Sequence, residues 1–358
     1  MELGKTLTCL LAAVFLIRPA TAATEHENAW PAPEEIRQFV AEMHERHGFD
    51  PTELGALLAT IKPNPVVLRA IAPPTDPGVR SWQRYRARFL DRARIENGVR
   101  FWNTHADTLT SAETAFGVPP EIIVAIIGVE TEYGRNKGNF SVLEALSTIA
   151  FAYPPRRDFF RSELEQFLLL TRENRQAPEA VLGSYAGAIG IPQFMPGSQR
   201  KFAVDFDEDG RVDLMSSPQD AIGSVARFLK LHGWEKDQTV TERITTVPEQ
   251  PESLLGAGIR PSLDRPALQQ AGVAAENLPS RYPAALIDLV TPGDATEYWW
   301  GFNNFYAITR YNRSSFYAMS VVQLAEAIRS RRLDPRPLMP MERKKVKASY
   351  RAKRRRAE

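Results

Sequence analysis

The sequence has almost no cysteine. The one cysteine among its 358 residues, Cys9, lies within an apolar N-terminal stretch, residues 7–17. A small-x-small pattern, A-T-A, follows this stretch and is typical of signal-peptide cleavage sites. We therefore predict an export signal over residues 1–23 that is cleaved near Ala22-Ala23, so that the mature protein is exported. The mature chain would then contain no cysteine, which excludes disulfide bonds and thiol chemistry.

Long apolar runs and a strong net charge are also missing. An uncleaved membrane anchor is the alternative interpretation of the N-terminus, but the apolar run is short for a span of about 20 residues. The formal net charge of +2 says little about partners. Basic residues gather in residues 336–358, where we predict a solvated, disordered tail. The alternative is an electrostatic tether to an anionic envelope surface. We expect no nucleic-acid binding from an exported chain.

The residues that are present predict a mainly α (α+β) fold. Apolar residues make up 43% and charged residues 25%, as in soluble globular proteins with a sizeable core. Apolar spacing predicts two helices within residues 24–60 and a long helical region over residues 81–116. Prolines and glycines predict a loop over residues 63–78. Three further helices are predicted for VPPEIIVAIIGVE, SVLEALSTIAFAY and RRDFFRSELEQFLLLTREN.

The pattern changes near Gln238. Strands are predicted for QTVTERITTV, PAALIDLVT and EYWWGF, because these stretches alternate or are rich in β-branched and aromatic residues. NNFYAITRYN is predicted to be extended or a loop, and a helix follows in SSFYAMSVVQLAEAIRSR. We therefore predict a helical region over residues 24–237, a small strand-rich insert over 238–300, and a return to the helical core over 301–335.

Two glutamates end the most apolar predicted helix. In EIIVAIIGVETEYGR, Glu130 continues the row of Ile122 and Ile126, since positions four apart share a helix face. Glu132 is about 200° further round and points away. Burial and the negative end of the helix dipole, before a stop at Gly134, would both raise the pKa of Glu130. A protonated carboxyl near neutral pH suits a general acid. The alternative is a carboxylate that pairs with a core arginine or caps a turn.

Two other stretches suit a ligand-binding groove. GSYAGAIGIPQFMPGS combines glycines, which permit close backbone approach, with Gln193 and Phe194. ITRYNRSSFYAMS contains Tyr311, Asn312 and Tyr317, and aromatic and amide side chains of this kind recur at sugar-binding sites. An ordinary glycine-rich connection is the alternative for the first stretch. Either signal alone is weak.

An acidic loop forms the second strong local signal. In DFDEDGRVDL, carboxylates fall at positions 1, 3, 5 and 9 and glycine at position 6, as in the front half of a calcium-binding EF-hand loop. Ser216 occupies position 12, where a bidentate Glu is expected. Asp220 would close the site if the loop is longer. The alternative is a charged turn without metal. The predicted calcium ligands are Asp205, Asp207, Asp209, the backbone carbonyl of Arg211, and Asp220.

Taken together, these stretches resemble the lytic murein transglycosylase B family. The resemblance extends from about residue 30 to 335 and includes FWNTH, SWQRYRARFL and DAIGSVARFLKLHGW in the same order. It implies a lysozyme-like helical core with an additional helical domain and a small strand-rich domain. It also implies that calcium binds through an extended EF-hand-like loop. The loop here is one residue longer, so Asp220 is the least secure ligand.

The resemblance further assigns the site residues. Glu130 would be the single catalytic acid and base, and no cofactor would be needed for catalysis. Phe228 replaces a residue that is commonly Tyr in the family, which removes one hydroxyl contact. The residues implied to line the glycan groove are Tyr85, Ser184, Gln193, Phe194, Phe228, Tyr311, Asn312 and Tyr317.

The implied substrate is the glycan strand of peptidoglycan, cut between N-acetylmuramic acid and N-acetylglucosamine with formation of a 1,6-anhydro end. One alternative is a muramidase that hydrolyses the same bond and usually needs a second carboxylate. Another is a non-catalytic, calcium-stabilised protein that binds peptidoglycan. The choice between cleavage within strands and cleavage from their ends stays open, as do complexes with other cell-wall enzymes.

Overall fold

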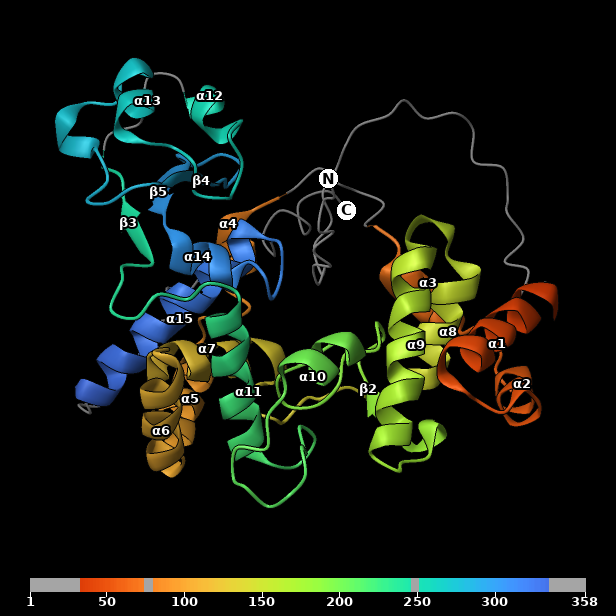
Figure 1. The fold of residues 1–358 in the computed structure, drawn as a ribbon. Helices are drawn as coiled ribbons and strands as arrows, with labels where there is room; N and C mark the ends of the chain where they lie inside the picture. Colours follow the sequence, from red (N-terminus) through yellow and green to blue (C-terminus); the bar gives the residue numbers. More distant parts are fainter. Residues whose placement is uncertain (1–32, 74–79, 246–250, 335–358) are drawn as a thin grey trace, which may run out of the picture.

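The computed structural model describes residues 33–73, 80–245 and 251–334. The predicted export signal and the basic tail lie outside these residues. Figure 1 shows two helical parts joined by a narrower middle, with a small sheet above one of them. This arrangement confirms the prediction of a mainly α fold with a small strand-rich portion.

The first helical part has its own hydrophobic cluster. Val142 to Ile149 and Phe160 to Leu170 contribute buried apolar residues that pack on Phe39, Met43 and Leu58. Asp50 and Asn64 begin helices by accepting hydrogen bonds from backbone N–H groups of the first turn. The helices of this part are α1 (Pro33–His47), α2 (Pro51–Ala59), α3 (Pro65–Ile71), α8 (Val142–Ala152) and α9 (Arg157–Glu173).

The second helical part surrounds one apolar helix. α7 (Pro120–Thr131) is buried along nearly its whole length and packs against four other helices of this part, α5, α6, α11 and α15. A helix that is apolar all round belongs in the centre of a core, which explains the run of Ile and Val. The other helices of this part are α4 (Trp82–Arg86), α5 (Arg92–Thr104), α6 (Ala106–Phe116), α11 (Pro218–Leu231), α14 (Asn303–Ile308) and α15 (Ser315–Leu333).

A three-stranded antiparallel sheet in the order β3-β5-β4 forms the third part. Successive side chains of β4 point to opposite faces: Ala285, Ile287 and Leu289 join the cluster around α7, whereas Leu286 packs on Trp300 in a separate cluster. The sheet therefore lies directly on the core. Its elements are β3 (Thr241–Arg243), β4 (Ala285–Leu289) and β5 (Glu297–Gly301), with α12 (Pro251–Leu255), α13 (Arg265–Gln270) and a 3₁₀ turn, η3 (Ala275–Asn277).

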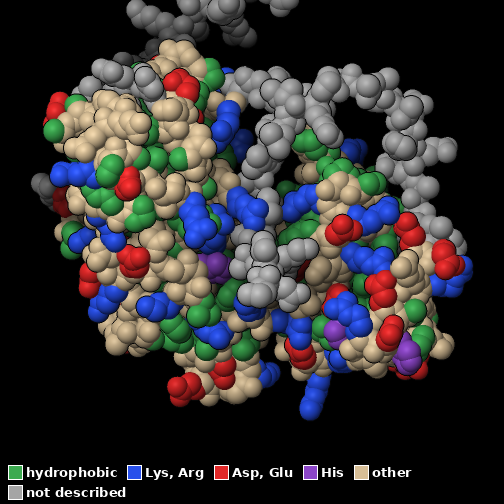
Figure 2. All heavy atoms as spheres, turned by 45° about the horizontal axis from the view of Figure 1, so that its top comes forward, with side chains coloured by type: hydrophobic (Ala, Val, Ile, Leu, Met, Phe, Trp, Pro, Cys, Tyr) green, Lys and Arg blue, Asp and Glu red, His purple; other side chains and the backbone are tan. Residues whose placement is uncertain are grey.

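Short elements connect the two helical parts. β1 (Phe140–Ser141) pairs with β2 (Leu182–Gly183), and α10 (Pro196–Phe202) lies in the narrow middle of Figure 1. Two 3₁₀ turns, η1 (Pro154–Arg156) and η2 (Pro178–Ala180), flank α9. Figure 2 shows Lys and Arg side chains along the facing edges of the two parts.

The helical region predicted over residues 81–116 is confirmed and consists of α4, α5 and α6. Three other local predictions are corrected. The predicted loop over 63–78 contains α3, because Asn64 caps its start and Pro65 fits the first turn. NNFYAITRYN contains α14 in place of an extended segment. The helix that carries Glu130 ends at Thr131, before Gly134, because Glu132 already has a left-handed conformation with φ 51°.

Within the described residues, no single helix is both long and apolar enough to cross a bilayer. Only the bent pair α6 and α7, with 112° between them, meets the length and composition criteria together.

Candidate active site

Glu130 lies at the C-terminal end of α7 and is partly exposed. The hydroxyl of Tyr317, on α15, donates a hydrogen bond of 2.5 Å to Glu130 Oε1. Burial raises the pKa of the Glu130 carboxyl to about 7, while the hydrogen bond from Tyr317 acts in the opposite direction. The carboxyl is therefore about half protonated at neutral pH, and its hydrogen-bond partner is a tyrosine, not a core arginine.

Glu132 points elsewhere, but it lies beyond the end of α7 in a left-handed conformation, so the direction does not follow from the helical spacing. Its Oε1 accepts a hydrogen bond of 2.7 Å from Arg94 Nη2, on α5, and about half of its side chain is exposed. Arg94 Nη1 also donates to the carbonyl of Gly128 in α7. Glu132 and Tyr133 both have positive φ, 51° and 65°, which is uncommon for residues other than glycine. The two glutamates of the motif therefore diverge, and Arg94 holds the turn that separates them.

Tyr133 also stabilises this turn. Its hydroxyl donates to the carbonyl of Arg94 at 2.9 Å. A Cβ on either Gly98 or Gly128 would lie 2.6 Å from that hydroxyl, so both glycines are needed for the tyrosine to enter between α5 and α7. Sequence reasoning missed Arg94 and Tyr133, since Arg94 precedes Glu132 by 38 residues and no local pattern links them.

Two of the three predicted groove tyrosines, Tyr85 and Tyr317, lie beside Glu130, and Tyr311 lies near Tyr317. Burial, and secondarily the charge of Glu130, raises the pKa of Tyr85 to about 12. Burial and Glu130 also raise the pKa of Tyr317, with a smaller effect from Tyr311. These phenols therefore stay protonated at neutral pH and act as hydrogen-bond donors. Tyr85 also packs edge-on against Phe316, with ring centroids 5.7 Å apart.

The structure corrects the predicted roles of Phe194 and Phe228. Each is only 2% exposed, so neither ring presents a face to a ligand. Both pack against Tyr311, with ring centroids 5.7 Å and 4.7 Å from it, and Tyr311 donates to the carbonyl of Pro192 at 3.0 Å. Phe194 and Phe228 therefore support Tyr311 from the core. The sequence shows an aromatic residue but not which way its ring faces.

The glycine-rich segment turns sharply beside the end of α7. Ser184 Oγ accepts the N–H of Ala188 at 3.0 Å, and a Cβ on Gly190 would lie 2.4 Å from the carbonyl oxygen of Leu214. Gln193, with φ 51°, is partly exposed. Asn312 Oδ1 is buried and has no hydrogen-bond partner among the described residues. The segment thus packs tightly through its backbone and leaves Ser184 and Gln193 accessible.

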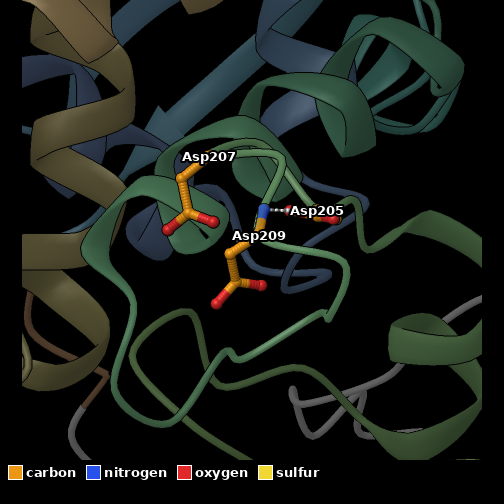
Figure 3. A group of neighbouring side chains, drawn as sticks. All are labelled: Asp205, Asp207 and Asp209. Carbon is orange, nitrogen blue, oxygen red and sulfur yellow. Dashed lines mark hydrogen bonds between the residues drawn. The ribbon is translucent and has the colours of Figure 1, made fainter.

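The acidic loop brings three carboxylates together. One oxygen from each of Asp205, Asp207 and Asp209 lies within 4.8 Å of the others (Figure 3). Asp205 accepts the N–H groups of Asp209, at 3.1 Å, and Gly210, at 2.8 Å, which curls the loop around its first residue. Carboxylate oxygens that lie this close together suit a hard cation such as calcium.

The other two predicted ligands make contacts within the loop. The side chain of Arg211 is 81% exposed, and its N–H donates to Asp209. Asp220 is buried at the start of α11, where its two oxygens accept the N–H groups of Phe206, at 2.8 Å, and Asp213, at 2.7 Å. Asp220 therefore holds both arms of the loop together.

Comparison with known proteins places this geometry in a family. Residues 32–326 match the family described as transglycosylase SLT domain. The chain is 39% identical over 324 residues to membrane-bound lytic murein transglycosylase B of Escherichia coli K12, covering 88% of both chains.

Two solved structures are similar in fold as well. The soluble lytic transglycosylase SltB1 of Pseudomonas aeruginosa is 46% identical, with a TM-score of 0.76 over 83% of this chain and 99% of that one. The E. coli lytic transglycosylase Slt35 in complex with calcium is 38% identical, with a TM-score of 0.73 over 87% of this chain and 100% of that one. The chain therefore belongs to the lytic murein transglycosylase B family, and it is a lytic transglycosylase that acts on peptidoglycan.

Proposed function

We propose that this enzyme cleaves the β-1,4 bond between N-acetylmuramic acid and N-acetylglucosamine with Glu130 as both acid and base, leaving a 1,6-anhydro-muramic acid end. The observation that carries the proposal is the environment of Glu130, which gives the carboxyl a pKa of about 7 at the end of a buried helix. A group with this pKa both donates and accepts a proton readily near neutral pH. Lys and Arg side chains along the facing edges of the two helical parts also favour a polymer whose peptide stems carry carboxylates (Figure 2).

The reaction divides into two proton transfers through one residue. The protonated Glu130 gives its proton to the glycosidic oxygen as the bond to the anomeric carbon breaks. Positive charge that develops at this carbon is stabilised by the 2-acetamido oxygen of the substrate or by dipoles of the site. Glu130, now a carboxylate, takes the proton of the 6-hydroxyl, whose oxygen attacks the anomeric carbon. The hydrogen bond from Tyr317 stabilises the carboxylate between these steps.

Two alternative functions would require different features of the site. A muramidase would use a water molecule and usually a second carboxylate close to Glu130. The nearest carboxylate in the motif, Glu132, is directed away and bonded to Arg94. A protein that only binds peptidoglycan would not need a carboxyl with a raised pKa beside Tyr317.

Mass spectrometry of a peptidoglycan digest tests the proposal. Purified peptidoglycan is incubated with the mature protein, with the Glu130→Gln variant and with the Glu132→Gln variant. We expect 1,6-anhydro ends, one water lighter than hydrolysed ends, from the wild type and from Glu132→Gln, and none from Glu130→Gln. Reducing muramic acid ends would support the muramidase instead. Binding without cleavage by the wild type would support the binding protein.

We also propose that the acidic loop holds a structural calcium ion. Asp205, Asp207 and Asp209 supply carboxylates that lie close together. The sequence places Arg211 at position 7 of the loop, where EF-hand loops use a backbone carbonyl. Asp220 is proposed to act mainly by holding the loop closed, with a second lone pair of an oxygen available to the ion. Calcium would neutralise the mutual repulsion of these carboxylates and take no part in the reaction.

The remaining proposals concern where the protein is located in the cell and what it binds there. Export to the periplasm fits a peptidoglycan substrate, and a relative of this chain bears the name membrane-bound. The substrate partner is the glycan strand, and the basic residues 336–358 would add contact with an anionic envelope surface. Deleting those residues should reduce association with cell walls at low salt, and unchanged association at low and high salt would remove this role.

A further inference from the structure

Lys137 lies between the predicted groove and the end of the acidic loop. It belongs to the connection between α7 and β1 and is half-buried. Its ammonium group donates a hydrogen bond of 2.6 Å to the carbonyl of Met215, which follows the acidic loop. Its own backbone carbonyl accepts a hydrogen bond of 3.1 Å from Nε2 of Gln193. Lys137 thus contacts Gln193 through its backbone carbonyl and Met215 through its side chain.

These contacts fix the orientation of the Gln193 carboxamide. Nε2 donates to two backbone carbonyls, those of Lys137 at 3.1 Å and Gly190 at 2.9 Å. A carbonyl can only accept, so the nitrogen and not the oxygen must occupy this side of the amide. Both amide hydrogens are then used within the protein. Gln193 offers its carbonyl oxygen to the groove, where it can accept from an N–H or O–H group of the glycan.

The backbone around Gln193 is already held by other contacts. Ile191 donates its N–H to the carbonyl of Leu214 at 2.7 Å, and its own carbonyl accepts the hydroxyl of Thr131 at 2.8 Å. The carbonyl of Lys137 accepts no backbone N–H within the described residues, and Gly138, which follows it with φ 88°, packs against the backbone of Gly183. The bond from the Lys137 ammonium to Met215 adds an anchor at Lys137 itself.

We propose that Lys137 is a positioning residue for glycan recognition: its side chain, bonded to Met215, holds its carbonyl where that carbonyl orients Gln193 as a hydrogen-bond acceptor. The inference rests on the proposed place of Gln193 in the groove. Lys137 itself need not contact the glycan, so its effect should pass entirely through Gln193. An effect of this kind is measurable, since two residues that act through one contact are not additive.

A double-mutant cycle tests the proposal on the mature protein with soluble glycan fragments as substrate. Lys137→Met keeps the aliphatic chain and removes the donor, and Gln193→Ala removes the oriented amide. We expect each single variant to lower kcat/KM about tenfold, mainly through KM, as the loss of one ligand hydrogen bond would. The double variant should equal Gln193→Ala alone. Lys137→Arg, which can still donate to Met215, should restore most of the activity.

Controls separate this role from loss of stability. Lys230→Met, at an exposed position of α11, should leave both kcat and KM unchanged. Melting curves identify a variant that is not folded at the assay temperature; if Lys137→Met is such a variant, Lys137→Leu, which also has no donor, replaces it in the cycle. Losses that multiply in the double variant would overturn the role of Lys137 and leave Gln193 in the groove. A Gln193→Ala variant with normal kinetics would overturn both.

Discussion

Replacing Glu130 by Gln should abolish activity and at the same time stabilise the fold at alkaline pH. Gln has nearly the same shape, and its carbonyl can still accept the hydrogen bond from Tyr317. Gln cannot ionise, however. The folded variant is therefore not destabilised by a charged carboxylate at a buried position. Loss of a general acid alone typically lowers the rate about 10²–10⁴-fold.

The size of the stabilisation follows from the pKa. The folded state raises the pKa of Glu130 from 4.5 to about 7. At about 1.4 kcal/mol for each tenfold change in the acid constant, ionisation is about 3 kcal/mol less favourable in the folded state. Because the side chain is partly exposed, we expect about 2 kcal/mol in practice.

The difference in stability between Glu130→Gln and the wild type depends on pH. Below pH 4.5 the carboxyl is protonated in both the folded and the unfolded chain, so the variant and the wild type should be equally stable. Between pH 4.5 and 7 the unfolded chain loses its proton first, and the wild type loses stability relative to the variant. Above pH 7 both states are ionised, and the difference should be constant.

Urea denaturation of both proteins at pH 4 and pH 8 measures this difference, with equal calcium in all samples. The exposed Glu45 of α1 provides a control, and Glu45→Gln should show no comparable change between the two pH values. A difference between Glu130→Gln and wild type that is the same at both pH values would refute the reasoning. Such a result would mean that burial does not set the pKa of Glu130.

Four further outcomes are expected. Wild-type activity should fall about tenfold per pH unit above pH 7 in a pH-rate profile, because Glu130 must begin the reaction protonated; a flat profile to pH 9 would contradict this. Calcium should raise the melting temperature, and Asp205→Ala or Asp209→Ala should remove that effect in thermal scans with calcium or chelator. Glu132→Gln should keep most activity, since its amide oxygen can still accept from Arg94; a loss as large as that of Glu130→Gln would contradict the divergence of the two side chains. Burial also raises the pKa of Glu163 to about 7, so Glu163→Gln should be more stable than wild type at pH 8, equal at pH 4 and fully active in a turbidity assay.

Local sequence patterns predicted the elements whose signals are strong. The apolar run of α7, the β-type composition of β4 and the acidic spacing from Asp205 to Asp209 are each visible in a short stretch of sequence. The divergence of Glu130 and Glu132 was expected from helix geometry but arises from the left-handed turn after Thr131. The family resemblance supplied what no local pattern contains, namely the proximity of Tyr85 and Tyr317 to Glu130.

Contacts between distant residues could not be predicted from the sequence. Phe194 and Phe228 have the composition of a groove wall, but tertiary packing turns both into the core behind Tyr311. The left-handed turn at Glu132 has no glycine at that position. Its stabilising contacts join it to Arg94, a residue far away in the sequence, which bonds to Glu132 and accepts from Tyr133. Lys137 was missed for the same reason, since its partner Met215 is 78 residues away.

The most direct test of the account is digestion of peptidoglycan in water enriched in ¹⁸O. If the 6-hydroxyl of the substrate attacks the anomeric carbon, the newly formed ends carry no ¹⁸O and are anhydro sugars. The account predicts this result for the wild type, with no cleavage by Glu130→Gln. Incorporation of one ¹⁸O into each new muramic acid end during the reaction would show that water is the nucleophile. That result would contradict the single-glutamate transglycosylase and require a second catalytic group near Glu130.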